Sequence, residues 1–290
     1  MSCDSYYGIG ESPTHAVCQD YALHGSLNDV EYIIIADGCS SSKYSEVGAQ
    51  ILCHAAKFQI EEKILSNSIE RDSIEDNLLK LSMSICKRAE FIKNAYPISG
   101  NVLEATLLIA IEIKGKVYTF TWGDGVIIAD YLLSDGNSKQ FVTKIEYSLN
   151  APFYLVSDPE KYLKWCKRKG VDSPTATQTY YFFSEGKRDK TEIEVSYQER
   201  FIHMFQSLPM LGVQLSSVTI CSDGITSYQD SKKEDVRLDL TIPELVAFKN
   251  TTGEFVKKRM FFFDKKAKKK NWSHYDDISC GTIYLNGTVK

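Results

Sequence analysis

The sequence predicts an α+β protein, in which helices and antiparallel strands occupy separate stretches of one chain. Three observations support this class. Residues 30–36 form an apolar run typical of a buried strand, residues 45–92 contain two helical periodicities, and residues 105–132 contain strand-like runs divided by glycine-containing turns. With 290 residues, of which 43% are hydrophobic, the chain can bury a large core. A chain of this length is long enough for one large domain or for two small ones, and we expect a single domain spanning residues 1–290.

Composition and charge argue against several classes of function. A formal net charge of −4 provides no overall attraction to nucleic acid or to an anionic membrane. The eight cysteines include no Cys-x-x-Cys pair, which argues against a zinc ribbon or a dithiol redox site and fits a reducing compartment. No window approaches the length of a membrane span, and the N-terminus does not resemble a signal peptide. We expect a cytoplasmic monomer without membrane or nucleic-acid partners.

The N-terminal third contains one buried strand and two helices. The strand runs into Asp37-Gly38, a dipeptide that is also common in simple turns. A first helix is expected with Ser45 as its N-cap. Its apolar face would consist of Val47, Ile51, Ala55 and Phe58. The second helix has a clearer apolar stripe, formed by Ile74, Leu78, Leu81, Ile85, Ala89 and Ile92. Both stripes predict contacts with the core.

The remainder of the chain favours strands. Residues 105–112, 116–122 and 126–132 predict an antiparallel meander. Its second turn places Asp124 at a strand end. A functional role for this acid and a plain hairpin turn explain its position equally well. We interpret residues 146–215 as an insertion packed beside the main sheet. The chain ends with a strand over residues 278–285.

Acidic residues recur at the ends of these strands. The set consists of Asp20, Asp37, Asp124, Asp223 and either Asp276 or Asp277. Clustered carboxylates repel one another unless divalent charge is present, and all-oxygen ligation selects Mg²⁺ or Mn²⁺. Two ions that hold a water between them are suited to hydrolysing a phosphate ester. Neither a Gly-x-Ser-x-Gly nor a Gly-x4-Gly-Lys-Ser/Thr motif offers a competing chemistry.

Six stretches, in this order, resemble the metal-dependent protein phosphatases of type 2C: Gln19-Asp20, Ala36-Asp37-Gly38, Ala105-Thr106, Trp122-Gly123-Asp124-Gly125, Ser222-Asp223-Gly224 and Asp276-Asp277-Ile278-Ser279. The resemblance covers about residues 8–286 and is closest to a divergent bacterial branch. It implies a four-layer α/β/β/α sandwich, with two antiparallel sheets flanked by helices and two metal ions in a cleft at one end. Residues 146–215 would then form a flap beside that cleft.

The resemblance also implies roles for single residues. Asp37 would bridge two Mn²⁺ or Mg²⁺ ions, and the Gly38 carbonyl would help to bind one of them. Asp223 and Asp276 would complete the ligands of the other ion. Asp20 would support these ligands or hold metal through water, and Asp124 matches the acid of a weaker third site.

Three positions depart from the pattern of the family. His15 stands where many members have a phosphate-binding arginine, and it lacks the guanidinium fork. The loop of residues 39–43 lacks the histidine that acts as general acid in other members, so either His15 or a metal-bound water would supply the proton. Asp277 stands where asparagine is usual; the order of the motif favours Asp276 as the ligand.

The resulting hypothesis is a serine/threonine phosphoprotein phosphatase that uses a metal-bridged water and forms no phosphoenzyme. Asp37, Asp223 and His15 are its expected catalytic residues, and a phosphoserine or phosphothreonine protein is its expected substrate. The alternative is a pseudophosphatase that retains the cleft only for recognition. A nucleic-acid-binding role for the basic clusters at residues 257–259 and 265–270 is a third hypothesis, although a solvated helix face is the commoner explanation of such clusters.

Overall fold

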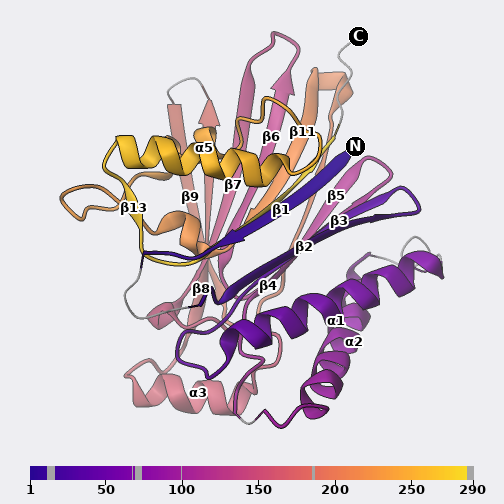
Figure 1. Cartoon of the computed structure of the whole chain (residues 1–290), viewed down its shortest axis with the longest axis vertical. Helices are drawn as coiled ribbons and strands as arrows, with labels where there is room; N and C mark the ends of the chain where they lie inside the picture. Colours follow the sequence, from indigo (N-terminus) through magenta and orange to yellow (C-terminus); the bar gives the residue numbers. More distant parts are fainter. Residues whose placement is uncertain (12–16, 67, 69–73, 99, 185–186, 286–290) are drawn as a thin grey trace.

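The chain folds into two main antiparallel β-sheets packed face to face (Figure 1), and a small two-stranded sheet pairs β12 (Tyr228–Gln229) with β13 (Ser273–His274). This computed structural model describes residues 1–290 except 12–16, 67, 69–73, 99, 185–186 and 286–290. The seven-stranded sheet has the order β1 (Ser2–Gly8), β14 (Ile278–Tyr284), β11 (Val213–Cys221), β6 (Gly125–Leu133), β7 (Ser138–Tyr147), β8 (Thr175–Ser184), β9 (Lys187–Ser196). The five-stranded sheet has the order β10 (Phe201–Gln206), β5 (Lys116–Trp122), β4 (Leu107–Ile113), β3 (Val30–Asp37), β2 (Asp20–Leu27).

Helices cover the outer face of each sheet. The helices α1 (Ser45–Leu65) and α2 (Ile74–Asn94) pack on the five-stranded sheet, and α4 (Leu238–Leu245) and α5 (Phe255–Lys269) pack on the seven-stranded sheet. A shorter helix, α3 (Pro159–Arg168), lies at one end of the sandwich (Figure 1). This arrangement confirms the predicted four-layer sandwich. No helix in the described part of the chain is long and apolar enough to cross a membrane.

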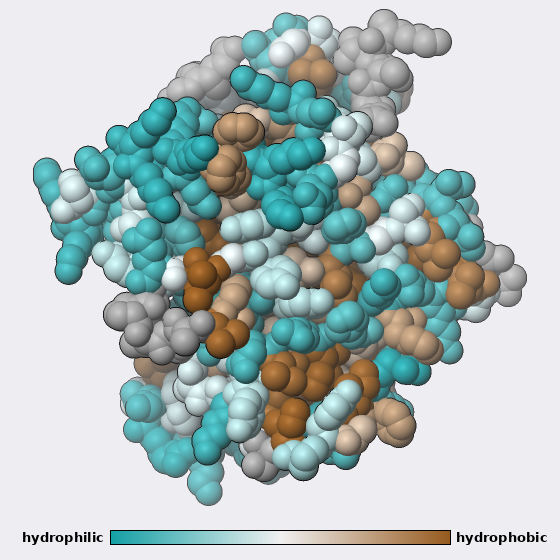
Figure 2. Space-filling model, viewed as in Figure 1, coloured by the Kyte–Doolittle hydropathy of each residue, from teal (hydrophilic) through white to brown (hydrophobic). Residues whose placement is uncertain are grey.

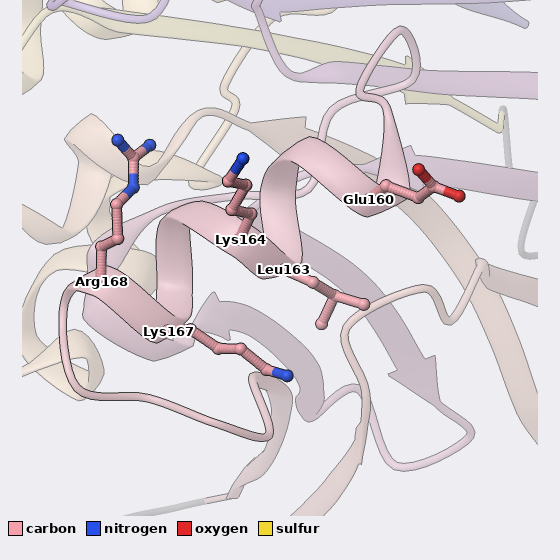
Figure 3. A pocket seen from close by; sticks show the side chains of 5 residues that line it. All are labelled: Glu160, Leu163, Lys164, Lys167 and Arg168. Atoms are coloured by element: carbon pink, nitrogen blue, oxygen red, sulfur yellow. The ribbon is translucent and has the colours of Figure 1, made fainter.

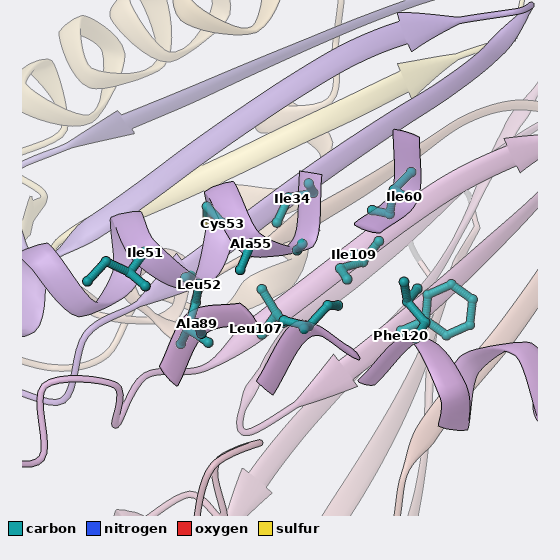
Figure 4. Close-up of a cluster of buried hydrophobic side chains, with 14 of the residues drawn as sticks. Ile34, Ile51, Leu52, Cys53, Ala55, Ile60, Ala89, Leu107, Ile109 and Phe120 are labelled. Carbon is teal, nitrogen blue, oxygen red and sulfur yellow. The ribbon is translucent and has the colours of Figure 1, made fainter. Parts of the chain in front are cut away.

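The alternation of side chains along β3 shows how the layers are built. Tyr32 and Ile34 belong to the apolar cluster under α1 and α2, which Figure 4 shows in close-up. The intervening Ile33 and Ile35 belong to a second cluster, between the two sheets. Because successive side chains of a strand point to opposite faces, a continuous apolar run is what a strand covered on both faces requires. The sequence 30–36 therefore places β3 in the middle of the molecule.

The predicted three-stranded meander is wrong at its third strand. The strands β4 and β5 pair as expected, but β6 pairs with β7 and β11 in the other sheet. The turn around Asp124 is therefore a corner between sheets and not a hairpin. Its flanking glycines have positive φ angles of 95° at Gly123 and 149° at Gly125. A Cβ on Gly125 would lie only 2.7 Å from Leu108 Cδ2, so the corner passes tightly between the sheets.

Residues 146–215 contribute to both sheets. They contain α3, the strands β8 and β9 that extend the seven-stranded sheet, and β10 at the edge of the five-stranded sheet. Phe153 and Tyr162 of this region contact Tyr197, with ring centroids 5.1 and 5.0 Å away. The segment before β8 is thus held against the turn between β9 and β10.

Candidate active site

The five-stranded sheet brings the first two acids together. Asp20 begins β2, Asp37 ends β3, and the two are direct cross-strand partners. The end of β3 is fixed by Thr106, whose Oγ1 accepts a hydrogen bond from the Asp37 N–H at 3.0 Å. In return, the Thr106 N–H donates to the Asp37 carbonyl at 2.8 Å. The adjacent Gly38 is buried, and its N–H donates to the Gln19 carbonyl at 3.2 Å.

The seven-stranded sheet contributes the next two acids. Asp124 immediately precedes β6, and Asp223 follows β11 as the first residue of the short helix η3 (Asp223–Thr226). These strands are neighbours, because Val126 of β6 pairs with Cys221 of β11. Both acids therefore lie at the same end of these two strands. The carboxylate of Asp223 also interacts with that of Asp37, so the two sheets meet at this cluster.

Asp20 has the most unusual environment of the cluster. It is only 2% exposed, and neither carboxylate oxygen has a hydrogen-bonding partner among the described residues. Burial raises the pKa of Asp20 to about 7, although interactions with Asp37, Ser222 and Ser279 oppose the shift. A buried carboxylate without donors is unfavourable. Its oxygens are thus available to a cation or to an ordered water.

The other members of the cluster repel one another. Burial, followed by the negative charges of Asp20 and Asp223, raises the pKa of Asp37 well above its usual range. Burial and the charge of Asp223 likewise raise the pKa of Asp124. Burial also raises the pKa of Asp223, against the opposing effects of Asp37 and the positive charge of Lys144. The site therefore gathers more negative charge than its own residues neutralise.

The two C-terminal acids have different environments. Asp277 is buried, and its carboxylate accepts hydrogen bonds from the backbone N–H groups of Gly10 at 2.8 Å and Gln19 at 2.6 Å. Asp276 is exposed, and its charge contributes to the raised pKa of Asp124. Asp277 thus anchors the chain that leads into β2, whereas Asp276 lies close enough to the cluster to influence it.

A close backbone contact ties this segment to Asp223. A Cβ placed on Gly224 would lie 1.8 Å from the carbonyl oxygen of Asp277, closer than any real Cβ contact allows. Glycine is therefore required after Asp223 for β14 to begin beside η3. The Asp-Gly pair at residues 223–224 serves both as a source of a carboxylate and as a packing contact.

The donor set fits a hard divalent cation. It consists of carboxylates, and Asp20 and Asp223 each have buried oxygens without a partner among the described residues. Oxygen ligands of this kind are typical of Mg²⁺ and Mn²⁺. In the described part of the chain, however, no three His, Cys, Asp or Glu side chains are arranged to hold an ion together. The match is therefore one of chemistry and not of a completed coordination shell.

Two further expectations concern the neighbourhood of the cluster. His15 lies outside the described residues. The loop after Gly38 is held by Glu104, whose carbonyl accepts from the Cys39 N–H at 2.9 Å and whose carboxylate accepts from the Ser42 hydroxyl at 3.0 Å. Burial alone would raise the pKa of the Cys39 thiol. Hydrogen bonds involving Ser41 and Tyr154 outweigh this effect, so that the pKa of the thiol is lowered.

Two neighbours of the cluster were not identified as site residues from the sequence. Burial raises the pKa of Tyr154, and the charges of Cys39, Asp124 and Asp37 add to the shift, which places its hydroxyl near the acids. Lys144 of β7 provides the positive charge near Asp223 and forms an ion pair with Glu146 at 2.7 Å. Neither lies in a recognisable motif.

A separate hollow of about 480 Å³ lies on α3 (Figure 3). Its lining residues are Glu160, Leu163, Lys164, Lys167 and Arg168. Lys164 and Arg168 extend from one side of the helix, and Leu163 and Lys167 from another. None of the strand-end acids lines this hollow, so it is distinct from the carboxylate cluster.

Comparison with known proteins identifies the family of the chain and agrees with its fold. The profile of the protein phosphatase 2C family matches residues 10–260. Among solved structures, the chain is similar to a bacterial serine phosphatase in a single-residue variant, with 14% identity, 100% of both chains covered and a TM-score of 0.58. It is also similar to the serine/threonine phosphatase Stp1 from Staphylococcus aureus, with 13% identity, 99% of this chain and 96% of that chain covered and a TM-score of 0.52. No curated protein sequence matches the chain.

Proposed function

Because the chain belongs to the protein phosphatase 2C family, we propose that it is a metal-dependent phosphatase acting on phosphoserine or phosphothreonine in a protein substrate. The observation that carries this proposal is the meeting of Asp20, Asp37, Asp124 and Asp223 at strand ends of the two sheets, where Asp20 and Asp223 have buried oxygens without a partner among the described residues. We further propose that residues 1–290 act as one catalytic domain and that residues 146–215 border its site.

The carboxylates have distinct proposed roles. Asp37 faces Asp20 in its own sheet and Asp223 from the other, so it would contact two ions. Gly38 and Asp20 would support the first of these ions, and Asp223 and Asp276 the second. Asp124 would hold a third, weaker ion. When bound, Mn²⁺ or Mg²⁺ would neutralise phosphate charge and lower the pKa of a water molecule.

The remaining steps depend on groups around the cluster. Asp20 is buried and Asp37 is partly buried, and electrostatic attraction to a phosphate group is stronger in such an environment than in bulk water. Either His15 or a metal-bound water would deliver a proton to the departing serine or threonine oxygen, and His15 would also contact the phosphate. Lacking a guanidinium fork, it would hold the phosphate less firmly than an arginine.

The function is tested by hydrolysis of p-nitrophenyl phosphate and of a phosphoserine peptide with Mn²⁺, with Mg²⁺ and with EDTA. We expect turnover only with metal, and we expect Asp37→Asn and Asp223→Asn each to reduce it by roughly a thousandfold or more, because each removes charge at the reacting centre. Asp135→Asn is the matched control, since this acid is exposed in the turn between β6 and β7 and should leave turnover unchanged.

The same assay separates the enzyme from a pseudophosphatase. A wild-type protein that binds the phosphopeptide but releases no phosphate with either metal would be a recognition module. Turnover that is insensitive to EDTA and to both substitutions would exclude the proposed mechanism altogether.

A further inference from the structure

Helix α5 exposes two adjacent aromatic side chains on its outer face. Its inward face is formed by Val256, Met260, Phe263 and Ala267, all of which are buried against the seven-stranded sheet. Phe261 and Phe262 point away from this core and are 56% and 61% exposed. Adjoining large apolar groups on a protein surface commonly mark an interaction site. Nothing in the fold itself requires them there.

Lysines surround this aromatic pair. Residues three or four positions apart share one face of a helix, so Lys258, Lys265 and Lys269 lie along the same stripe as the two phenylalanines. Lys268 is exposed on the adjoining flank. None of these four lysines has a carboxylate within 4 Å among the described residues. In Figure 2, the region over α5 shows a small hydrophobic area surrounded by hydrophilic side chains.

The geometry of the rings restricts the kind of partner. The Lys265 ammonium lies 4.2 Å from the centroid of Phe261 and covers one face of that ring. Phe262 meets Phe261 edge to face, at 5.8 Å between centroids and 69° between planes. The two rings therefore form an apolar knob and not a pair of open platforms on which nucleotide bases could stack. Arg259 is turned away, with a side chain only 16% exposed that pairs with Glu244.

We propose that this face of α5, defined by Lys258, Phe261, Phe262, Lys265, Lys268 and Lys269, binds the surface of an anionic lipid bilayer. The helix lies on the outermost layer of the sandwich, so its convex face can meet a flat partner without a groove. The phenylalanines would enter the boundary between headgroups and acyl chains, and the lysines would contact anionic headgroups. The overall charge of −4 does not oppose this, because the positive charge is local.

This binding goes beyond the proposed phosphatase activity and does not depend on it. It would bring the protein to a membrane surface through one face of a single helix. It also assigns a role to Lys265, Lys268 and Lys269, and it accounts for the exposed phenylalanines, which a merely solvated helix face would not explain.

The test is co-sedimentation of the full chain with vesicles of phosphatidylcholine alone and with vesicles containing one-third phosphatidylglycerol. We expect binding only to the anionic vesicles, and weaker binding as salt is raised. Replacing a lysine near an anionic surface should weaken binding about fivefold, so Lys265→Ala with Lys269→Ala should weaken it by roughly twentyfold or more. Phe261→Ser with Phe262→Ser should weaken it by at least about tenfold.

A second exposed apolar pair provides the matched control. Met210 and Leu211 are 100% and 73% exposed in the short helix η2 (Pro209–Leu211), and no lysine lies near them in the sequence. Met210→Ser with Leu211→Ser should therefore bind vesicles like the wild type. Circular dichroism is the check that each variant is folded. We expect all of them to be folded, because the substituted side chains are exposed.

Three results would overturn the proposal. The first is a wild-type protein that does not sediment with anionic vesicles at low salt. The second is equal loss of binding in the phenylalanine variant and in the control variant. The third is tight binding to a single-stranded oligonucleotide that depends on Phe261 and Phe262, because this would identify a nucleic-acid surface instead.

Discussion

Asp276 and Asp277 illustrate how two adjacent acids acquire different functions. The sequence motif favours Asp276 as a metal ligand but does not exclude its neighbour. In the structure, both oxygens of Asp277 are engaged by the backbone N–H groups of Gly10 and Gln19. Hydrogen bonds to a carboxylate are among the stronger ones in proteins. Asp277 is therefore committed to holding the N-terminal segment, which leaves Asp276 as the better candidate ligand.

Substitution at these two positions should affect different properties. Asp277→Asn replaces one acceptor by a donor that faces a backbone N–H, and it should lower the free energy of unfolding by about 2 kcal/mol. Asp276→Asn should leave the unfolding of the metal-free protein nearly unchanged but raise the Mn²⁺ concentration needed for half-maximal activity about tenfold or more. Urea titrations and metal titrations measure the two effects. The opposite pattern would assign the ligand to Asp277.

Asp20 makes the metal-free protein sensitive to pH. Its folded-state pKa of about 7 lies above its ordinary value of 3.8, so between these values the folded chain binds this proton more tightly than the unfolded chain does. Stability should therefore fall as pH rises through this interval and level off above it.

This effect is measured by urea unfolding in EDTA at about pH 6 and about pH 8. We expect the wild type to be less stable at the higher pH, and we expect Asp20→Asn to lose part of that difference, because it cannot ionise whereas Asp37 and Asp124, whose pKa values are also raised, still can. Added Mn²⁺ should stabilise the wild type more at the higher pH, where the carboxylates are charged. An equal pH dependence in wild type and variant would show that Asp20 is not the responsible group.

At the scale of elements, the contact between η3 and the start of β14 connects the fold to the site. Gly224→Ala would place a Cβ 1.8 Å from the Asp277 carbonyl, so one of the two segments has to move. We expect a loss of about 3 kcal/mol in the free energy of unfolding, within the range of severe overpacking. Thermal and urea unfolding measure it, and weaker Mn²⁺ binding should accompany it.

Gly136→Ala is the matched control for this substitution. Gly136 has a φ of 86° but open space where its Cβ would lie, so only local backbone strain of about 1 kcal/mol is expected. Equal destabilisation of the two variants would mean that the contact between Gly224 and Asp277 does not position the site.

Local signals misplaced some details of the helices. Ser45 was expected to cap α1, but the N-cap is Tyr44 in a left-handed conformation with a φ of 58°. The Ser45 hydroxyl accepts a hydrogen bond from the Gln19 side chain instead. Phe58 was expected in the core but is 46% exposed, with the Arg88 guanidinium 3.4 Å from its ring centroid. In both cases the side chain contacts a residue far away in the sequence and does not make the local contact that the sequence pattern implied.

For the whole molecule, the sequence was sufficient for the fold class and for the positions of five strands, which are β3, β4, β5, β6 and β14. The pattern of apolar residues in 30–36 and 105–132 predicts β3 to β6. Successive side chains of a strand point to opposite faces, so the pattern shows whether one face or both faces are buried. The sheet that β6 joins was not predictable in this way. A glycine-flanked corner between sheets and a hairpin turn have the same local pattern, and only the pairing partners distinguish them.

The candidate site was predictable to a similar degree. Acids at strand ends identify Asp20, Asp37, Asp124 and Asp223 as members of one cluster, and the structure brings Asp37 next to Asp20 and Asp223. The division of roles between Asp276 and Asp277 depends on backbone groups far away in sequence. The exposure of Phe261 and Phe262 also had no sequence signal, since an apolar residue in a helix is expected to be buried.

The central claim is that acids from both sheets form one divalent-metal site. Isothermal titration of Mn²⁺ into the EDTA-treated protein, after removal of the chelator, tests it without reference to any substrate. We expect saturable binding of at least two ions per chain in the wild type, and loss of at least one of them in Asp37→Asn, because this carboxylate faces acids from both sheets. No saturable binding in the wild type, or unchanged stoichiometry in Asp37→Asn, would contradict the account.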